Sequence, residues 1–135
     1  MGLLTNPYAH LKAAASGDLE ALRALADHSI ELTRHACADP VRALQEGLIF
    51  ARMAAAVGTI CDKGRVLGML ALCGECANDY ATQMDCLAEG IAMASIMADH
   101  GEELAADGVN LLSEGSSPEV LELAKVYELI LKDVY

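Results

Sequence analysis

Apolar residues recur at helical spacing along most of the chain, and short polar segments containing glycine or proline separate these periodic stretches. A residue able to cap a helix precedes each proline, in Asn6-Pro7, Asp39-Pro40 and Ser117-Pro118. Proline suits the first helical position, because the amide it lacks would have no helical partner there. The pattern predicts seven helices, at 7–16, 18–37, 40–57, 60–78, 83–100, 102–113 and 118–133.

Other residues mark further helix boundaries. Two sequences resemble capping boxes, Thr59-x-x-Asp62 and Thr82-x-x-Asp85. Typical helix stops follow four of the periodic runs, at Gly17, Gly58, Gly101 and Gly115. Because the linkers are short, we expect consecutive helices to pack as antiparallel hairpins. With 54% apolar and only 4% aromatic residues, the chain is predicted to form one all-α domain over residues 1–135.

Two of the predicted helices carry an internal repeat. EGLIFARMAAAVG at 46–58 aligns with EGIAMASIMADHG at 89–101 at an offset of 43 residues. The apolar positions also correspond, with Val41, Leu44, Leu48, Ala51 and Ala55 matching Met84, Leu87, Ile91, Ala94 and Ala98. Each set forms one stripe along a helix. Repeats of this length are typical of helix pairs that bury their apolar faces by stacking.

The residues of the first repeat resemble a known class of helical repeat. The order Asp39, Arg42-Ala43, Ala54-Ala55 and Gly58 is similar to that of Sel-type and tetratricopeptide repeats, over residues 40–101. The chain departs from these families in a first helix longer by about a turn, and in lacking the Trp and Gly-Tyr signature. The resemblance implies a short right-handed α-solenoid, with a compact helical bundle as the alternative. It also implies protein binding on a concave face, and it carries over no catalytic residue.

The charge of the protein is concentrated in one part of the chain. The net charge is −11, and residues 66–124 contain eleven acidic residues but no Lys or Arg. Such a distribution argues against nucleic-acid binding and favours a basic protein or peptide as partner. The expected partner contacts are Glu75, Asp79, Asp85, Glu89, Met93 and Met97. The alternative is a solvated surface that maintains solubility.

Cysteines offer a second hypothesis. Cys73 and Cys76 are three residues apart on a predicted helix, so both thiols could face one ligand, with Cys61 and Cys86 on either side in the sequence. A thiol-based metal or redox site is therefore the alternative function, centred on Cys73 and Cys76. Against it, no second tight cysteine pair follows, and no strand precedes the motif as in redox proteins. Packing of these thiols in the core remains the other interpretation.

Three glycines fall within the predicted helix 60–78, at positions 64, 68 and 74. Gly64, Gly68 and Ala71 share one face, where a neighbouring helix or a ligand could approach closely; we expect a helix there. No phosphate-binding loop and no catalytic motif is present, so the protein is predicted to be a non-enzymatic interaction module without a cofactor.

The remaining expectations concern location and assembly. We find no basic segment followed by an apolar run near residue 1 and no apolar run of about 20 residues, so we expect a cytoplasmic protein that does not enter membranes. Helix 118–133 carries apolar residues widely, so it could dock on another copy and form a homodimer.

Overall fold

The computed structural model describes residues 3–35 and 37–135, and its architecture is all-α. In this part of the chain a 3₁₀ helix, η1 (Pro7–His10), leads into seven α-helices. These are α1 (Leu11–Ala15), α2 (Leu19–Arg34), α3 (Pro40–Val57), α4 (Ile60–Cys76), α5 (Tyr80–Asp99), α6 (Glu103–Glu114) and α7 (Pro118–Leu131). The described residues contain no strand, which confirms the predicted fold class.

Most predicted helix starts are confirmed. Asn6, Asp39 and Ser117 each accept a backbone N–H within the first turn of the helix they precede. Thr59 begins α4 with a complete capping box in which the Asp62 carboxylate accepts the Thr59 amide at 2.8 Å. These side chains satisfy amides that have no partner inside the helix.

The predicted start of the fifth helix is wrong. Helix α5 begins at Tyr80, and Asp79 caps it by accepting both the amide and the hydroxyl of Thr82. A charged carboxylate is a stronger hydrogen-bond acceptor than a hydroxyl, so Asp79 is the better cap and Thr82 is its donor. The proposed box Thr82-x-x-Asp85 therefore lies inside the helix.

The structure also corrects several helix lengths. The predicted helix 7–16 is a 3₁₀ turn followed by the short α1, while α2 ends at Arg34 and α4 ends at Cys76. Gly17 and Gly101 follow helix ends with φ of 86° and 90°, where only glycine is unstrained. Gly58 is needed for a different reason: a Cβ there would overlap the Asp62 carboxylate.

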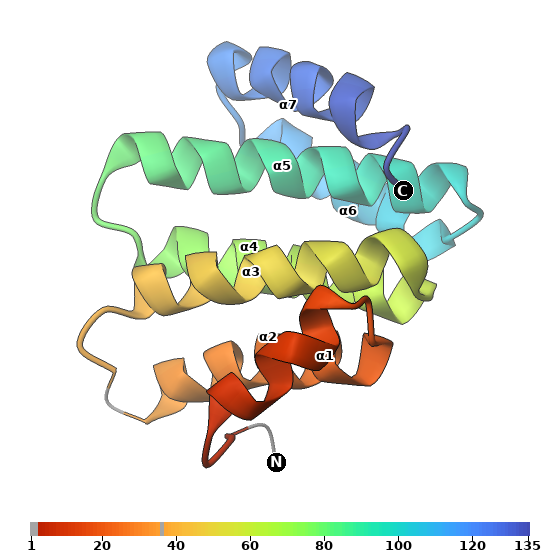
Figure 1. Cartoon of the computed structure of the whole chain (residues 1–135). Helices are drawn as coiled ribbons and strands as arrows, with labels where there is room; N and C mark the ends of the chain where they lie inside the picture. The colour runs from red at the N-terminus through yellow and green to blue at the C-terminus, as the bar shows by residue number, and fades with distance from the viewer. Residues whose placement is uncertain (1–2, 36) are drawn as a thin grey trace.

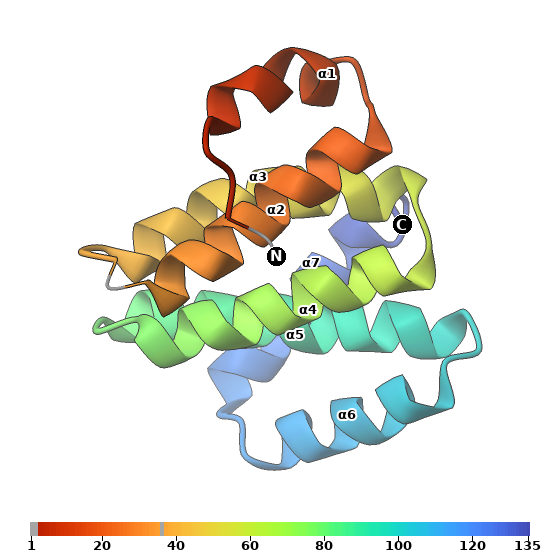
Figure 2. The same ribbon diagram turned by 90° about the horizontal axis from the view of Figure 1, so that it is seen from below.

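The helices form a stack in which each one packs against the next from α2 to α6 (Figure 1). Helix α7 departs from the expected hairpin order, because it turns back and packs against α5. Figure 2 shows the stack from below, with α1 lying across α2 at one end of the molecule. Among the described residues, no helix has both the length and the apolar content to cross a bilayer.

The core runs through the middle of this stack. Its main cluster joins Leu44 and Leu48 of α3 to Val66 and Met69 of α4 and to Met93 of α5. The predicted apolar stripes are buried or partly buried in both α3 and α5. This agreement supports the helical periodicity from which the stripes were predicted.

Two glycines at matching positions in the aligned segments face the preceding helix. A Cβ at Gly47 of α3 would overlap the Ser29 side chain of α2 and lie 3.0 Å from Cε of Met69. A Cβ at Gly90 of α5 would lie 3.6 Å from Leu67 of α4, which is ordinary contact. The expected close helix approach is therefore present at Gly47 and looser at Gly90.

Candidate binding groove

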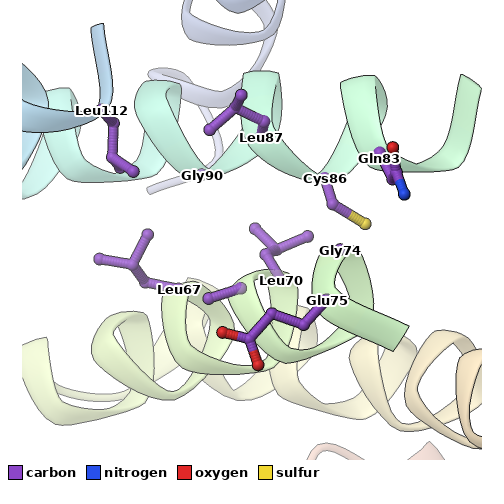
Figure 3. A pocket seen from close by; sticks show the side chains of 10 residues that line it. Leu67, Leu70, Gly74, Glu75, Gln83, Cys86, Leu87, Gly90 and Leu112 are labelled. Atoms are coloured by element: carbon purple, nitrogen blue, oxygen red, sulfur yellow. The ribbon is translucent and has the colours of Figure 1, made fainter. Parts of the chain in front are cut away.

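An apolar groove opens between α4 and α5. It has a volume of about 360 Å³, within the range of roughly 300–1,000 Å³ typical of ligand pockets. Its lining comes from Leu67, Leu70, Ala71, Gly74 and Glu75 of α4, from Gln83, Cys86, Leu87 and Gly90 of α5, and from Leu112 of α6. Figure 3 shows α4 below and α5 above, with the labelled leucines and Cys86 lying along the space between them.

Glycines line both walls of the groove, Gly74 on α4 and Gly90 on α5. A Cβ at Gly74 would lie 3.5 Å from Cβ of Cys86, so the two helices are not in closest contact there. Leu67, Leu87 and Leu112 are only partly buried, which leaves apolar surface open to an incoming side chain. Burying this surface under apolar groups of a ligand would be favourable.

The outer face of α4 continues the groove and corrects the expected helix contact at Gly64 and Gly68. A Cβ at either glycine would meet no atom within 4 Å, so none of the described helices covers this face. Ala71 and Glu75 follow on the same face and are exposed. A ligand approaching α4 here would meet a smooth, small-residue surface bordered by the pocket.

Among the described residues, the three helices that line the groove offer no Lys or Arg that is free of a polar partner. Of the three helices that line it, only α4 contains Lys or Arg, as Lys63 and Arg65. The Lys63 ammonium donates to the backbone carbonyl of Ala55 at 3.1 Å and lies 5.8 Å from the centre of the Tyr135 ring. The Arg65 guanidinium is bound by carboxylates, as described next. The exposed Glu75 at the groove therefore acts in a net negative field.

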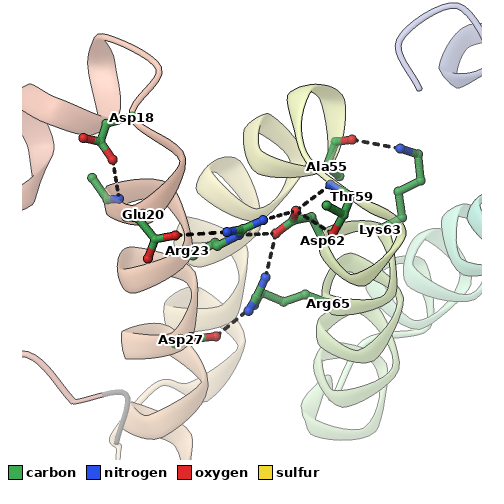
Figure 4. Close-up of polar contacts among 10 residues, drawn as sticks. Asp18, Glu20, Arg23, Asp27, Ala55, Thr59, Asp62, Lys63 and Arg65 are labelled. Atoms are coloured by element: carbon green, nitrogen blue, oxygen red, sulfur yellow. Dashed lines mark hydrogen bonds and ion pairs between the residues drawn. The ribbon is translucent and has the colours of Figure 1, made fainter.

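A buried carboxylate fixes α4 against α2 (Figure 4). Asp62 is 1% exposed and accepts both Nε and Nη2 of Arg23, each at 2.8 Å. It also accepts Nη1 of Arg65 at 3.0 Å, while Nε of Arg65 donates to Asp27 at 2.9 Å. The hydrogen bonds from Arg23 hold the pKa of the Asp62 carboxyl well below its usual value, and the Thr59 amide adds to this effect. One wall of the groove is therefore held in place by ion pairs on its far side.

Three of the predicted partner contacts are buried in the structure. Glu89 is buried, and both its oxygens accept the Arg52 guanidinium of α3, at 2.7 and 2.8 Å. Met93 and Met97 are also buried, in the main core cluster. A partner on the intact surface would not reach these three side chains, so their burial does not support their assignment as contacts. Arg52 and Glu89 are each the only charge in an apolar run of their helix, which is the sequence signal for such a pair.

The other three predicted contacts are exposed but do not share one site. Glu75 lines the groove, Asp79 caps α5 in the turn after α4, and Asp85 accepts the Tyr127 hydroxyl of α7 at 3.3 Å. Hydrogen bonds from the hydroxyl and amide of Thr82 lower the pKa of the Asp79 carboxyl. Only Glu75 is therefore both exposed and part of the groove. The leucines that form the groove were not predicted as site residues, because a leucine pattern does not show which face stays open.

The thiols are arranged differently from the predicted pair. Buried Cys73 interacts with Cys86 of α5, whereas Cys76 is half-buried and Cys61 is exposed. Burial raises the pKa of the Cys73 thiol, and burial together with Cys73 raises the pKa of Cys86 to about 12. Thiols with raised pKa values are poor nucleophiles and poor metal ligands. No cluster of three or more His, Cys, Asp or Glu suited to a metal ion occurs among the described residues.

Comparison with known proteins gives no relative for this chain. No protein family, no curated protein sequence and no solved structure matches it.

Proposed function

We propose that the protein is a non-catalytic interaction module that binds an amphipathic, basic helix of a partner protein in the groove between α4 and α5. The observation that carries the proposal is the combination of an open apolar groove with the absence of any available cation on the three helices that line it. A helix with one apolar face is a common ligand for such grooves.

The chemistry of the groove suits this ligand in two ways. Leu67, Leu87 and Leu112 offer partly exposed apolar surface, and burying one leucine of a partner is worth about 1.5–3 kcal/mol. The smooth face formed by Gly64, Gly68 and Ala71 lets a second helix lie close to α4. Lys or Arg residues flanking the partner's apolar face would be attracted by Glu75 and by the wider acidic surface.

A designed peptide with leucines at i, i+3, i+4 and i+7 and lysines elsewhere is the probe. We expect it to bind with an affinity that falls as salt is raised, and a counterpart with glutamate in place of lysine not to bind. Any strongly acidic protein attracts a basic peptide to some extent, so the decisive comparison uses two variants of equal charge.

Ala71→Arg places a long cationic side chain in the groove, whereas Ala56→Arg places one on an exposed part of α3 away from it. Both variants change the net charge by the same amount at exposed helical alanines. We expect Ala71→Arg to weaken peptide binding at least about tenfold, equivalent to about 1.4 kcal/mol, while Ala56→Arg binds almost as the parent does. Equal affinities of the two variants would show that the peptide is held by general charge attraction, and would refute the groove as the site.

A further inference from the structure

The outer face of α7 carries a group of exposed aliphatic side chains. Leu129 is 69% exposed, Ile130 59% and Val126 51%, and Val134 in the following turn is 49% exposed. The opposite face of α7 buries Val120 and Ala124 against α5. These four side chains therefore form a stripe, named here the α7 stripe, on the face turned away from the core.

The two ends of the stack differ in how they are covered. At the first end, the segment before α2 folds back so that Leu4, Ala13 and Ala14 pack against Leu22 and Leu25 of α2. At the other end α7 forms the edge of the molecule (Figure 1). No described segment folds over the α7 stripe. Contiguous exposed apolar surface of this kind commonly marks an interaction site.

Charges beside the stripe indicate what covers it. Lys125 and Lys132 are the only cations after residue 65, and both are exposed on or next to α7. Glu122, ten residues before Lys132, is exposed as well and already pairs with Lys125 of its own helix at 3.3 Å. If two copies of α7 pair in antiparallel fashion about an axis near Tyr127, Lys132 of each copy comes level with the Glu122–Lys125 pair of the other and supplies a second cation for Glu122. The helix dipoles then also run in opposite directions, which is favourable.

We propose that a second copy of this chain covers the α7 stripe in a two-fold symmetric, antiparallel contact. Self-association elsewhere on the C-terminal half is opposed by charge, because residues 66–124 contain no Lys or Arg. The stripe supplies a few hundred Å² per copy, less than the roughly 800 Å² per partner of a standard interface. The dimer is therefore weak and depends on concentration. This proposal does not depend on the groove, which lies between α4 and α5.

Sedimentation velocity of the full chain over a wide concentration range tests the proposal. We expect the parent protein to pass from monomer to dimer as its concentration rises, and Leu129→Glu to raise the dissociation constant at least about tenfold. Val57→Glu is the matched control, since Val57 is also 69% exposed but lies at the end of α3. We expect it to dimerise as the parent does.

Charge exchange tests the antiparallel arrangement separately from the apolar contact. Glu122→Lys and Lys132→Glu should each weaken the dimer, and the variant with both changes should regain the parent affinity. A chain that stays monomeric at all concentrations overturns the proposal. So does a dimer that survives Leu129→Glu, or a double exchange that fails to restore pairing. Circular dichroism of each variant verifies that the helices are retained.

Discussion

Replacing Asp62 by Asn is the sharpest test of how α4 is held in place. The substitution keeps the shape of the side chain and removes the charge that accepts two hydrogen bonds from Arg23 and one from Arg65. Removing one partner of a fully buried ion pair costs about 3–5 kcal/mol. The side chains of Arg23 and Arg65 are 27% and 23% exposed, so water recovers part of this loss. The new amide oxygen is also a weaker acceptor for the Thr59 backbone N–H at the start of α4. Together, these effects should lower the free energy of unfolding by about 2–4 kcal/mol.

Urea unfolding followed by far-ultraviolet circular dichroism measures this loss. The transition midpoint should fall while the slope stays the same, because the change affects stability and not the area exposed on unfolding. Glu20→Gln is the control: Glu20 also accepts from Arg23 at 3.0 Å, but its side chain is 86% exposed. An exposed pair of this kind is worth about 0–1 kcal/mol.

The effect of Asp62 also depends on pH in a defined direction. Its pKa is lower in the folded protein than the value of about 3.9 in the unfolded chain. Its stabilising contribution is therefore complete above the unfolded pKa and is lost as pH falls toward the folded value. The stability difference between parent and Asp62→Asn should accordingly shrink below about pH 4. A variant that costs no more than Glu20→Gln, or a difference that stays constant into acid, would refute the reasoning.

Two further predictions follow from packing and burial. Gly47→Ala should destabilise the protein by about 1–3 kcal/mol, because the added Cβ overlaps a side chain of α2. Gly68→Ala should stabilise it by up to about 1 kcal/mol, because the added Cβ meets no atom within 4 Å. Thermal unfolding measures both changes, and equal effects of the two substitutions would contradict the packing described. With a thiol reagent at mildly alkaline pH, exposed Cys61 should react first, Cys86 in the groove wall much more slowly because its pKa is raised, and Cys73 only on unfolding because it is fully buried. Labelling of Cys73 in the folded protein, or labelling of Cys86 as fast as that of Cys61, would support a redox or metal role.

Local sequence signals predicted the helices well where the cap is unambiguous. Each proline preceded by Asn, Asp or Ser marks an observed helix start, because both the cap and the proline act within one turn. The start of α5 was mispredicted because both Asp79 and Thr82 are residue types that cap helices, and in the structure Thr82 donates its amide and hydroxyl to the Asp79 carboxylate. The resemblance to Sel-type repeats, and the solenoid it implies, stay predictions.

The candidate site was harder to predict, because burial depends on contacts between distant residues. Glu89 belongs to the stretch of the sequence that lacks Lys and Arg, yet in the structure it pairs with Arg52, 37 residues earlier. The glycine face of α4 was visible in the sequence, but whether a neighbouring helix covers it depends on how α4 and α5 pack. A periodic pattern identifies the faces of a helix and leaves open which of them a neighbour covers.

Methyl-detected NMR of the full chain during titration with the lysine–leucine peptide tests the proposed function most directly. We expect the largest shifts at the methyl groups of Leu67, Leu87 and Leu112, and little change at Leu129 and Ile130 on the α7 stripe. Such a result would place the peptide in the groove between α4 and α5. Shifts confined to α7, or spread evenly over the surface, would contradict the assignment of that groove as the binding site.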